Sequence, residues 1–525
     1  MATSSLDSAT ATSFGLAQNS ANSVESAYAV EIHDIEHVPV ADDPRQWSNV
    51  RKNIILIIIA LASMVAGLGA NILNPSIEEI QSDLHASAAD FSWSISIYIL
   101  IQGSSTLLWS AVSEIGGRKF VYLVSLGCFT VGSIITANAK NMGILIGFRC
   151  LQGAGSSVVL TIGAASLADI FEPSERGTKM GIYYAAPLLG PSIGPIVGGA
   201  LTAAFNWRAS FWFLAIFGGL NFLSFLLLFK ETFRRERSAI YQRVLRQRLR
   251  YARSVEQPAL SVQPKPEATS VSSCSAPPSV DGVSPAQIRL SWRDVNPIRP
   301  AWHIIRRKNN VAILCVSGVF FAFSYCIVYT CSRTLSAPHY GYNSVTIGLV
   351  LLAFGIGSFT GSVLGGRWSD LVLRRLKAAN GNRSCPEMRL QSTQIAMCLL
   401  PCAVAGFGWV SERHLHVSTI CVMLFLCGLF SIWAYSSIAA YLVDANNGCS
   451  AVALACNSTS RGIAAFALAE AAVPWQDEIG DGWSYTVWAG MFACCTVLVF
   501  WVISKGEAWK EEGETKDVDS EAGQK

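Results

Sequence analysis

Charged residues are scarce in this chain: Asp, Glu, Lys and Arg make up 14% of its 525 residues, against about 25% in soluble domains. This amount of charge is too small to cover the water-facing surface of so long a chain. Most of the outer surface is therefore expected to face lipid. The 39 Lys and Arg residues barely exceed the 36 Asp and Glu residues. Because a nucleic-acid binder needs a basic face to neutralise phosphates, no nucleic-acid partner is predicted.

The sequence also lacks the paired motif CxxC, although it holds 15 cysteines. These lie scattered in apolar runs, as at Cys494 and Cys495, and are interpreted as small buried hydrophobic residues. No nucleophile–base or metal-ligand spacing is present, so neither an enzyme nor a bound cofactor is predicted. Residues 1–50 are rich in Ser and Ala, without the basic patch and short apolar core of a signal peptide.

Long apolar stretches, in contrast, are abundant. About 20 residues, at about 1.5 Å rise each, cross roughly 30 Å of hydrocarbon. Such runs lie near 52–73, 91–113, 120–138, 142–168, 179–203, 209–230, 309–332, 344–366, 392–411, 417–443, 450–473 and 483–504. Isolated strands cannot satisfy their backbone in lipid, and the alternation of barrel strands is absent. We therefore predict an all-α membrane protein with twelve transmembrane helices.

The spacing of the runs suggests two six-helix bundles joined by a hydrophilic break, as in many carriers. The predicted domains are a disordered N-terminal tail (1–50), a first bundle (51–230), a central loop (231–308), a second bundle (309–504) and a C-terminal tail (505–525). Within the loop, 255–285 is predicted to be a disordered linker. The arginine-rich stretch 234–250 is either a basic helix on an anionic leaflet or a solvated linker.

Orientation follows from the positive-inside rule. Lys and Arg crowd the turns after the second and eighth runs, whereas Lys140 and Arg413 are among the few in the opposite loops. Both termini and the long loop are therefore predicted to be cytoplasmic.

These two crowded turns share a layout. The first places Glu114 before Arg118 and Lys119, and the second places Asp370 before Arg374 and Arg375. A carboxylate at a helix end can hold cations or the positive N-terminus of another helix, which favours one conformational state until the contact breaks. The repeated layout predicts a gate in each half, and the alternative is ordinary topological charge.

Arg149 lies some seven residues into the fourth run, where a guanidinium costs several kcal/mol unless it is paired or faces a wet cavity. Together with Gln152, Gly153 and Ser156 it recurs at i, i+3, i+4 and i+7, so these residues share one helix face. That face is predicted to point at water or substrate. The alternative is an arginine that snorkels to the outer headgroups.

Small residues form seams in two runs. The fifth carries Gly190, Pro191, Gly194, Pro195 and Gly198; a partner pattern in the eighth consists of Gly357, Gly361 and Gly365. Glycines on one face permit close backbone approach, and each proline removes a hydrogen bond and bends the helix. We predict that the two bundles pivot along these seams, and the alternative is static packing.

At these residues the sequence resembles the major facilitator superfamily over nearly all of 43–504. The turn motif Glu114…Gly117-Arg118-Lys119, the fourth-helix motif Arg149…Gln152-Gly153…Gly155 and the fifth-helix motif Gly190-Pro191…Gly194-Pro195…Gly198-Gly199 are most similar to those of fungal twelve-helix drug:proton antiporters of the quinidine-resistance type. In the turn motif, Ser110, Glu114 and Ile115 depart from the usual residues.

The resemblance implies two six-helix bundles around a central cavity, alternating access, and export driven by a proton gradient with no cofactor. It also implies that the fifth helix contacts the eighth, that Arg149 serves proton coupling, and that the protein lies in the plasma membrane, with the vacuolar membrane as the alternative. A lipid-embedded monomer with a small organic substrate is expected.

Proton coupling needs a group that moves between water and a drier place. Glu470 is the one carboxylate clearly inside an apolar run, and it is predicted either to join the proton path or to be a boundary residue. Arg461 lies nine residues earlier, about 13.5 Å along the axis, too far for a direct pair.

Aromatic rings with hydrogen-bonding tips suit flat, amphipathic or cationic molecules. The predicted substrate-binding residues are Asn71, Gln152, Tyr325, Tyr329, Tyr435 and Asn457. The predicted function is proton-coupled efflux of drugs, toxins or fungal metabolites. The alternatives are a nutrient symporter or facilitator, and a receptor that does not transport.

Overall fold

The computed structural model describes residues 42–234, 241–242, 244, 298–381, 386–446 and 450–522. The chain forms two compact units, and every long helix belongs to the unit made of Trp47–Thr232 and Asn296–Lys525. The other unit combines Met1–Gln46 with Phe233–Val295. Most of the arginine-rich stretch 234–250 and all of the predicted linker 255–285 lie outside the described residues.

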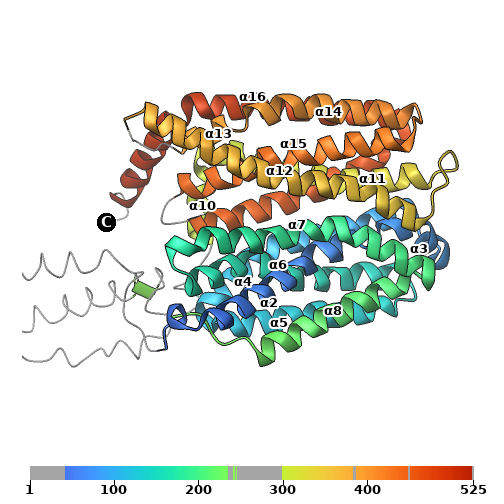
Figure 1. The fold of residues 1–525 in the computed structure, drawn as a ribbon, viewed down its shortest axis with the longest axis horizontal. Coiled ribbons are helices and arrows are strands. Elements are labelled where there is room, and N and C mark those ends of the chain that lie inside the picture. The colour runs from blue at the N-terminus through green and yellow to red at the C-terminus, as the bar shows by residue number, and fades with distance from the viewer. Residues whose placement is uncertain are drawn as a thin grey trace, which may run out of the picture. The chain divides into compact units, whose positions relative to one another are not determined.

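The described backbone of the large unit is helical, and Figure 1 separates its first-half helices from its second-half helices. The first half contains α2 (Asn49–Asn71), η3 (Asn74–Ser76), α3 (Ile77–Leu84), α4 (Ala88–Gly116), α5 (Arg118–Ala137), α6 (Met142–Ile170), α7 (Pro173–Ala204) and α8 (Trp207–Leu227). The second half contains α10 (Ile298–Arg306), α11 (Lys308–Ser336), α12 (Ser344–Ala379), α13 (Glu387–Gln391), α14 (Gln394–Glu412), α15 (Val417–Ala445) and α16 (Ser450–Ala522).

Ten described helices are long and apolar enough to cross a membrane. That number is two lower than the twelve predicted spans, and two helices explain the difference. The segment 452–506 counts once, although α16 is interrupted at Gly480, whose φ of 75° and ψ of 174° are not helical. Only the piece Ile193–Ala204 of the 32-residue α7 is counted as an apolar helix. The architecture is consistent with the twelve predicted crossings, and the prediction of an all-helical membrane protein is confirmed.

Local sequence explains where several helices begin. Ser87 and Asp90 form a capping box at the start of α4, in which the Ser87 hydroxyl accepts from the Asp90 amide and the Asp90 carboxylate accepts from Ser87. The side chains of Asn141, Asn206 and Asn343 cap α6, α8 and α12 in the same manner.

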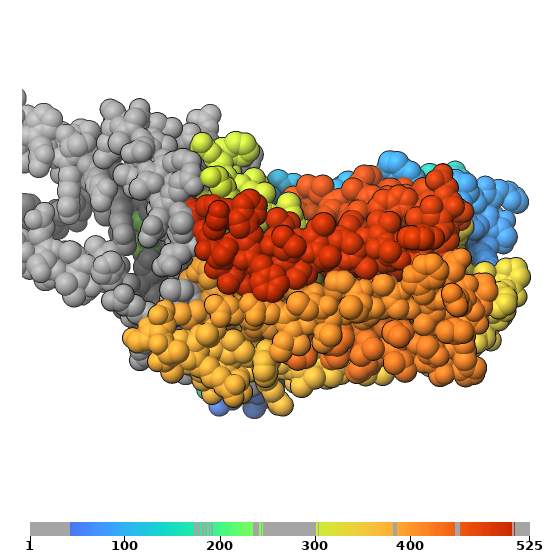
Figure 2. All heavy atoms as spheres, turned by 90° about the horizontal axis from the view of Figure 1, so that it is seen from above, coloured from blue at the N-terminus to red at the C-terminus, as the bar shows by residue number. Residues whose placement is uncertain are grey.

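Large apolar side chains remain exposed along the outer faces of the helices. Leu220, Val422 and Val497 are 60%, 57% and 68% exposed. Exposure of such side chains is costly in water and favourable in hydrocarbon. Figure 2 shows one such flank, where the red C-terminal helices lie beside the orange helices of the second half.

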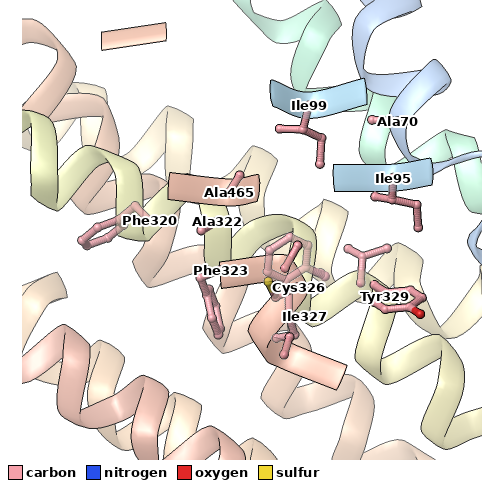
Figure 3. Packing of buried hydrophobic residues seen from close by; sticks show 14 of the residues in the cluster. Ala70, Ile95, Ile99, Phe320, Ala322, Phe323, Cys326, Ile327, Tyr329 and Ala465 are labelled. Atoms are coloured by element: carbon pink, nitrogen blue, oxygen red, sulfur yellow. The ribbon is translucent and has the colours of Figure 1, made fainter. Parts of the chain in front are cut away.

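Buried apolar side chains also continue from one half to the other. Figure 3 shows Ile95 and Ile99 of α4 and Ala70 of α2 approaching Cys326 and Tyr329 of α11, and all of them belong to one core cluster. A smaller cluster, which includes Tyr122, Phe225 and Phe229, holds the first half together by itself. One apolar core thus runs through the second half and part of the first, and a smaller core lies in the first half alone.

Helical structure also extends into segments predicted as loop and tail. Helix α10 lies inside 231–308, and its buried Ala301 and Ile304 belong to the core, with α10 packed on α11 and α16. Helix α16 continues to Ala522, through most of the predicted C-terminal tail.

The glycine seams pack inside their own halves, which corrects the predicted pivot between bundles. A Cβ added at Gly190 would lie 2.8 Å from the Cα of Gly67, and the contacts of Gly194 and Gly198 are likewise on α2 and the residue that follows it. Gly357, Gly361 and Gly365 instead press against Phe425, Leu429 and Trp433 of α15. The side chain of Pro191 lies outside the described residues. The predicted contact between the fifth and eighth helices does form, but through Gly348 against Pro195 and Gly199 against Ser344.

We therefore expect Gly361→Ala to destabilise the second half, because its new methyl group would overlap the Leu429 backbone. Overpacking of this kind costs about 1–3 kcal/mol. Gly366→Ala is the matched control, since an added Cβ there meets nothing within 4 Å. The measurement is thermal unfolding of the purified protein in detergent. Equal midpoints for the two variants would contradict a tight seam.

Candidate functional site

The two ends of the bundle differ in how the halves meet. We call the end with the Pro75 turn distal and the end with the Gly117 turn proximal. At the distal end, the Ser344 hydroxyl of the second half donates to the Pro75 carbonyl at 2.8 Å. The rings of Phe91 and Tyr329 stack at 5.9 Å between α4 and α11. These contacts close the distal end.

Helices α4 and α16 cross where both carry glycine. A Cβ at Gly103 would meet the Cα of Gly462 at 2.8 Å, and the Thr459 hydroxyl donates to the Gly103 carbonyl at 3.3 Å. Closer to the distal end, Trp93 packs edge-on against Phe466 with ring centroids 5.6 Å apart. Gly103 lies near the middle of α4, so these contacts lie between the middle of α4 and its distal end.

Glu470 of α16 contributes an acidic group to this contact zone. Its Oε1 atom accepts hydrogen bonds from the hydroxyls of Ser92, at 3.3 Å, and Ser96, both on α4. The carboxylate therefore joins the two halves and does not only mark a membrane boundary. A group that bridges halves in one conformation is exposed in any conformation in which they separate.

Two small cavities open between the halves at the distal end. One, of about 250 Å³, is lined by Glu78 and Gln81 from the first half and Tyr329 and Arg333 from the second. The other, of about 310 Å³, lies beside Asn74, Ser332 and Ser344. Both are at the small end of the range for ligand pockets.

Arg149 is completely buried inside the first half. Its Nε donates to the Ser94 carbonyl at 3.1 Å, its Nη1 donates to the Gly69 carbonyl at 2.7 Å, and its guanidinium carbon lies 4.5 Å from the Tyr98 ring centroid. Its Nη2 is buried without a partner. This burial excludes a snorkelling side chain. The guanidinium ties α6 to α2 and α4 through backbone carbonyls.

The rest of that helix face is also covered by protein, which corrects the prediction that it points at water or substrate. Gln152 donates to the Ser133 hydroxyl of α5 at 2.8 Å, and the Ser156 hydroxyl accepts from Tyr98 and Gln102 of α4 at 3.0 Å. The physical reason is that α6 packs on α2, α4 and α5 together. Asn71 is likewise buried, and its amide donates to the Gly67 carbonyl.

The proximal turn of the first half holds a buried charge cluster. Arg118 lies 3.3 Å from Glu114 and 3.5 Å from Asp169, and it also donates to the Ser113 hydroxyl. The backbone amides of Arg118 and Lys119 donate to the Glu231 carboxylate at 2.9 and 3.0 Å. The expected contact between Glu114 and Arg118 forms, and it links helices of one half.

The second half repeats this cluster with a different cation. Arg389 pairs with Asp444 and lies 4.0 Å from Asp370, whereas the bond seen for Arg374 among the described residues is to the Asp370 backbone carbonyl. The sequence grouped Asp370 and Arg374 in one predicted gate, and the described contact of the Asp370 carboxylate is with Arg389. Helix α12 continues to Ala379, so Arg374 lies one turn further on the same helix, while Arg389 reaches across from α13.

Three of these residues were not predicted as site residues from the sequence: Asp169, Arg389 and Asp444. Each is a charged residue close to a helix end, where charge is ordinary. The sequence feature that could have identified them is their matching positions in the two halves.

The remaining predicted binding residues lie in the second half. Tyr329 is buried against Phe91, and Asn457 is buried with its Oδ1 unpartnered. Tyr325 and Tyr435 are half-buried. The Tyr435 hydroxyl accepts a hydrogen bond from Arg461. Within the described part of α16, Arg461 forms no pair with Glu470, as the nine-residue spacing between them predicts.

Comparison with known proteins agrees with this architecture. The model of the Major Facilitator Superfamily matches residues 59–469. The MFS antiporter QDR3 of Candida albicans is 28% identical, with 92% of this chain and 82% of that protein aligned. Citrate exporter 1 of Aspergillus niger is 27% identical, over 90% of this chain and 89% of the exporter.

Solved structures share the fold. A partially occluded inward-open conformation of the xylose transporter XylE from E. coli aligns with a TM-score of 0.60 at 12% identity, covering 86% of this chain and 98% of that one. The human organic anion transporter MFSD10 aligns with a TM-score of 0.56 at 16% identity, covering 85% and 99%. With a family model matching most of its length and a fold shared with solved transporters, this chain belongs to the major facilitator superfamily.

Proposed function

We propose that this protein is an efflux transporter that exports hydrophobic or amphipathic organic compounds by alternating access, in exchange for protons. The similar proteins include an antiporter, a citrate exporter and an efflux pump from Floropilus chiversii. Two of these names state outward movement, and the third states antiport. We place the protein in the plasma membrane because of the family resemblance, with the vacuolar membrane as the alternative. The distribution of Lys and Arg places both termini and the proximal end in the cytoplasm.

The observation that carries this proposal is the hydrogen bonding of Glu470 to Ser92 and Ser96 across the two halves. In a carrier, separation of the halves at the distal end exposes this carboxylate to external water, from which it takes up a proton. Protonation removes the negative charge that strengthens the serine contacts. Proton entry and distal opening are thereby coupled through one residue.

Arg149, Glu114, Arg118, Asp370 and Arg389 have supporting roles in this scheme. The two proximal clusters keep each half rigid, and Arg149 fixes the geometry of α2, α4 and α6 next to the contact zone. The driving force is the proton gradient, with no bound cofactor. The alternative functions differ from this scheme in what moves across the membrane. A nutrient symporter moves its substrate inward with protons, and a receptor binds its ligand without transporting it.

The test is transport by the purified protein in sealed vesicles with an imposed pH gradient. We expect organic compounds to move against the direction of proton flow and this movement to stop when a protonophore is added. Co-directional movement would identify a symporter. Saturable ligand binding without flux would identify a receptor.

A further inference from the structure

A second arginine lies deep in the membrane region, and its surroundings are neutral. Arg461 of α16 is half-buried and donates from Nη1 to the Tyr435 hydroxyl of α15. Its Nη2 lies 3.4 Å from the Ser458 hydroxyl, and its guanidinium carbon lies 4.5 Å from the Phe321 ring centroid of α11. Three helices of the second half thus surround one cation with hydroxyl groups and aromatic rings.

No carboxylate compensates this charge within the described residues. The ion pairs described in the second half involve Arg333 and Arg389, and Glu470 is occupied by serines of the other half. An arginine stays protonated in proteins, and at membrane depth an uncompensated guanidinium costs several kcal/mol. Its Nε is also buried with no hydrogen-bond partner.

The side chains around Arg461 remain partly accessible. Phe321, Tyr325, Tyr435 and Ser458 are half-buried, unlike the fully buried Ile99 and Ala465 of the distal contact zone. Phe321 and Tyr325 pack edge-to-face at 4.8 Å and form an aromatic wall beside the guanidinium. A ligand that enters here meets two aromatic rings set at an angle to each other and one planar guanidinium.

We propose that Arg461, with Tyr435 and Phe321, binds the carboxylate of an organic acid whose apolar or aromatic body lies on the Phe321–Tyr325 wall. A guanidinium presents donors in a planar fork that matches a carboxylate. The same charge repels organic cations, so the aromatic residues of this half do not select cationic drugs. This inference rests on the proposed function, and it names the substrate class of the exporter.

The experiment measures binding to the purified full-length protein in phosphatidylcholine nanodiscs. The probes are naphthalene-1-carboxylate and its neutral amide, which have nearly the same shape. We expect the acid to bind about tenfold to a hundredfold more tightly than the amide, because charge-assisted bonds to one guanidinium carry the difference. Equal affinities in the wild-type protein overturn the inference without any variant.

Arg461→Gln is expected to reduce the acid-to-amide ratio to about one, whereas Arg461→Lys keeps a reduced preference because it retains the charge. Arg413→Gln is the control, since it removes a cation exposed beyond the membrane region. If Arg461→Gln does not fold, a reduced but measurable preference for the acid in Arg461→Lys, together with an unchanged preference in wild type saturated with anionic phosphatidylserine, supports a substrate site. If adding phosphatidylserine removes the preference for the acid, Arg461 binds lipid headgroups, and its role in substrate binding is overturned.

Vesicle transport separates this inference from the proposed function. If protonophore-sensitive flux occurs at the same rate for the acid and the amide, the inference is overturned and the export function stands. Selective binding of the acid without any protonophore-sensitive flux overturns export and leaves the site intact.

Discussion

Replacing Arg118 with alanine is expected to lower the free energy of unfolding by about 3–5 kcal/mol, the usual cost of removing one partner from a buried ionic cluster. The side chain is 8% exposed and lies against Glu114 and Asp169, which retain only 19% and 27% exposure. Without the guanidinium, two carboxylates face each other in a poorly solvated turn. The amount of folded protein recovered from the membrane should fall accordingly.

The neighbouring cation is the control for this prediction. Lys119 is exposed at its amino group, which donates to the Leu226 carbonyl at 3.0 Å, and Lys119→Ala should change stability by less than about 1 kcal/mol. Adding Asp169→Asn to Arg118→Ala should restore part of the loss, because the amide needs no compensating cation. Unfolding in denaturant measures all three variants. Equal destabilisation by Arg118→Ala and Lys119→Ala would mean that the cluster contributes little.

Glu470→Gln is expected to reduce proton-driven efflux at least tenfold and to flatten its dependence on external pH. Glutamine keeps the shape of the protonated acid and one carbonyl oxygen for Ser92 and Ser96, but it neither gains nor loses a proton. Hydrogen bonds to a charged acceptor contribute about 1.5–3 kcal/mol, enough for this change in rate. Exchange of substrate across the membrane without a gradient should survive.

The measurement compares initial efflux rates in vesicles at several external pH values. Glu478→Gln serves as the control, since this exposed carboxylate lies two turns further along the same helix. Ser96→Ala removes one donor without changing a titratable group, so it should alter the rate while the pH dependence remains. A Glu470→Gln protein with the pH profile of wild type would exclude this carboxylate from proton coupling.

The membrane class and the helical fold could be predicted because they depend on properties that each residue carries with it. Long apolar runs must be helical in lipid whatever their neighbours, and the repeated turn around Glu114 and Asp370 indicated two related halves. Arg149 was identified for the same reason, since charge in an apolar run is costly at any position.

Partnerships between side chains could not be predicted in the same way. The periodicity of Arg149, Gln152 and Ser156 correctly placed them on one helix face, but only the packing of α6 turned that face toward α2, α4 and α5. Asp370 and Arg374 were grouped in one predicted gate, but both lie on α12, and the cation that lies near the Asp370 carboxylate is Arg389 of α13. A pattern within a helix shows which residues share one face of that helix. It does not show which neighbouring helix that face contacts.

The sequence by itself determined that this protein is a multi-pass helical membrane protein, because hydrophobicity and backbone hydrogen bonding act locally along the chain. Only the tertiary structure decided that the glycine seams stay within each half, that Glu470 joins α16 to α4, and that Arg461 faces aromatic rings with no carboxylate partner among the described residues. These are contacts between residues distant in sequence, and they depend on the rotation and register of whole helices. Neither quantity is encoded in the composition of a single span.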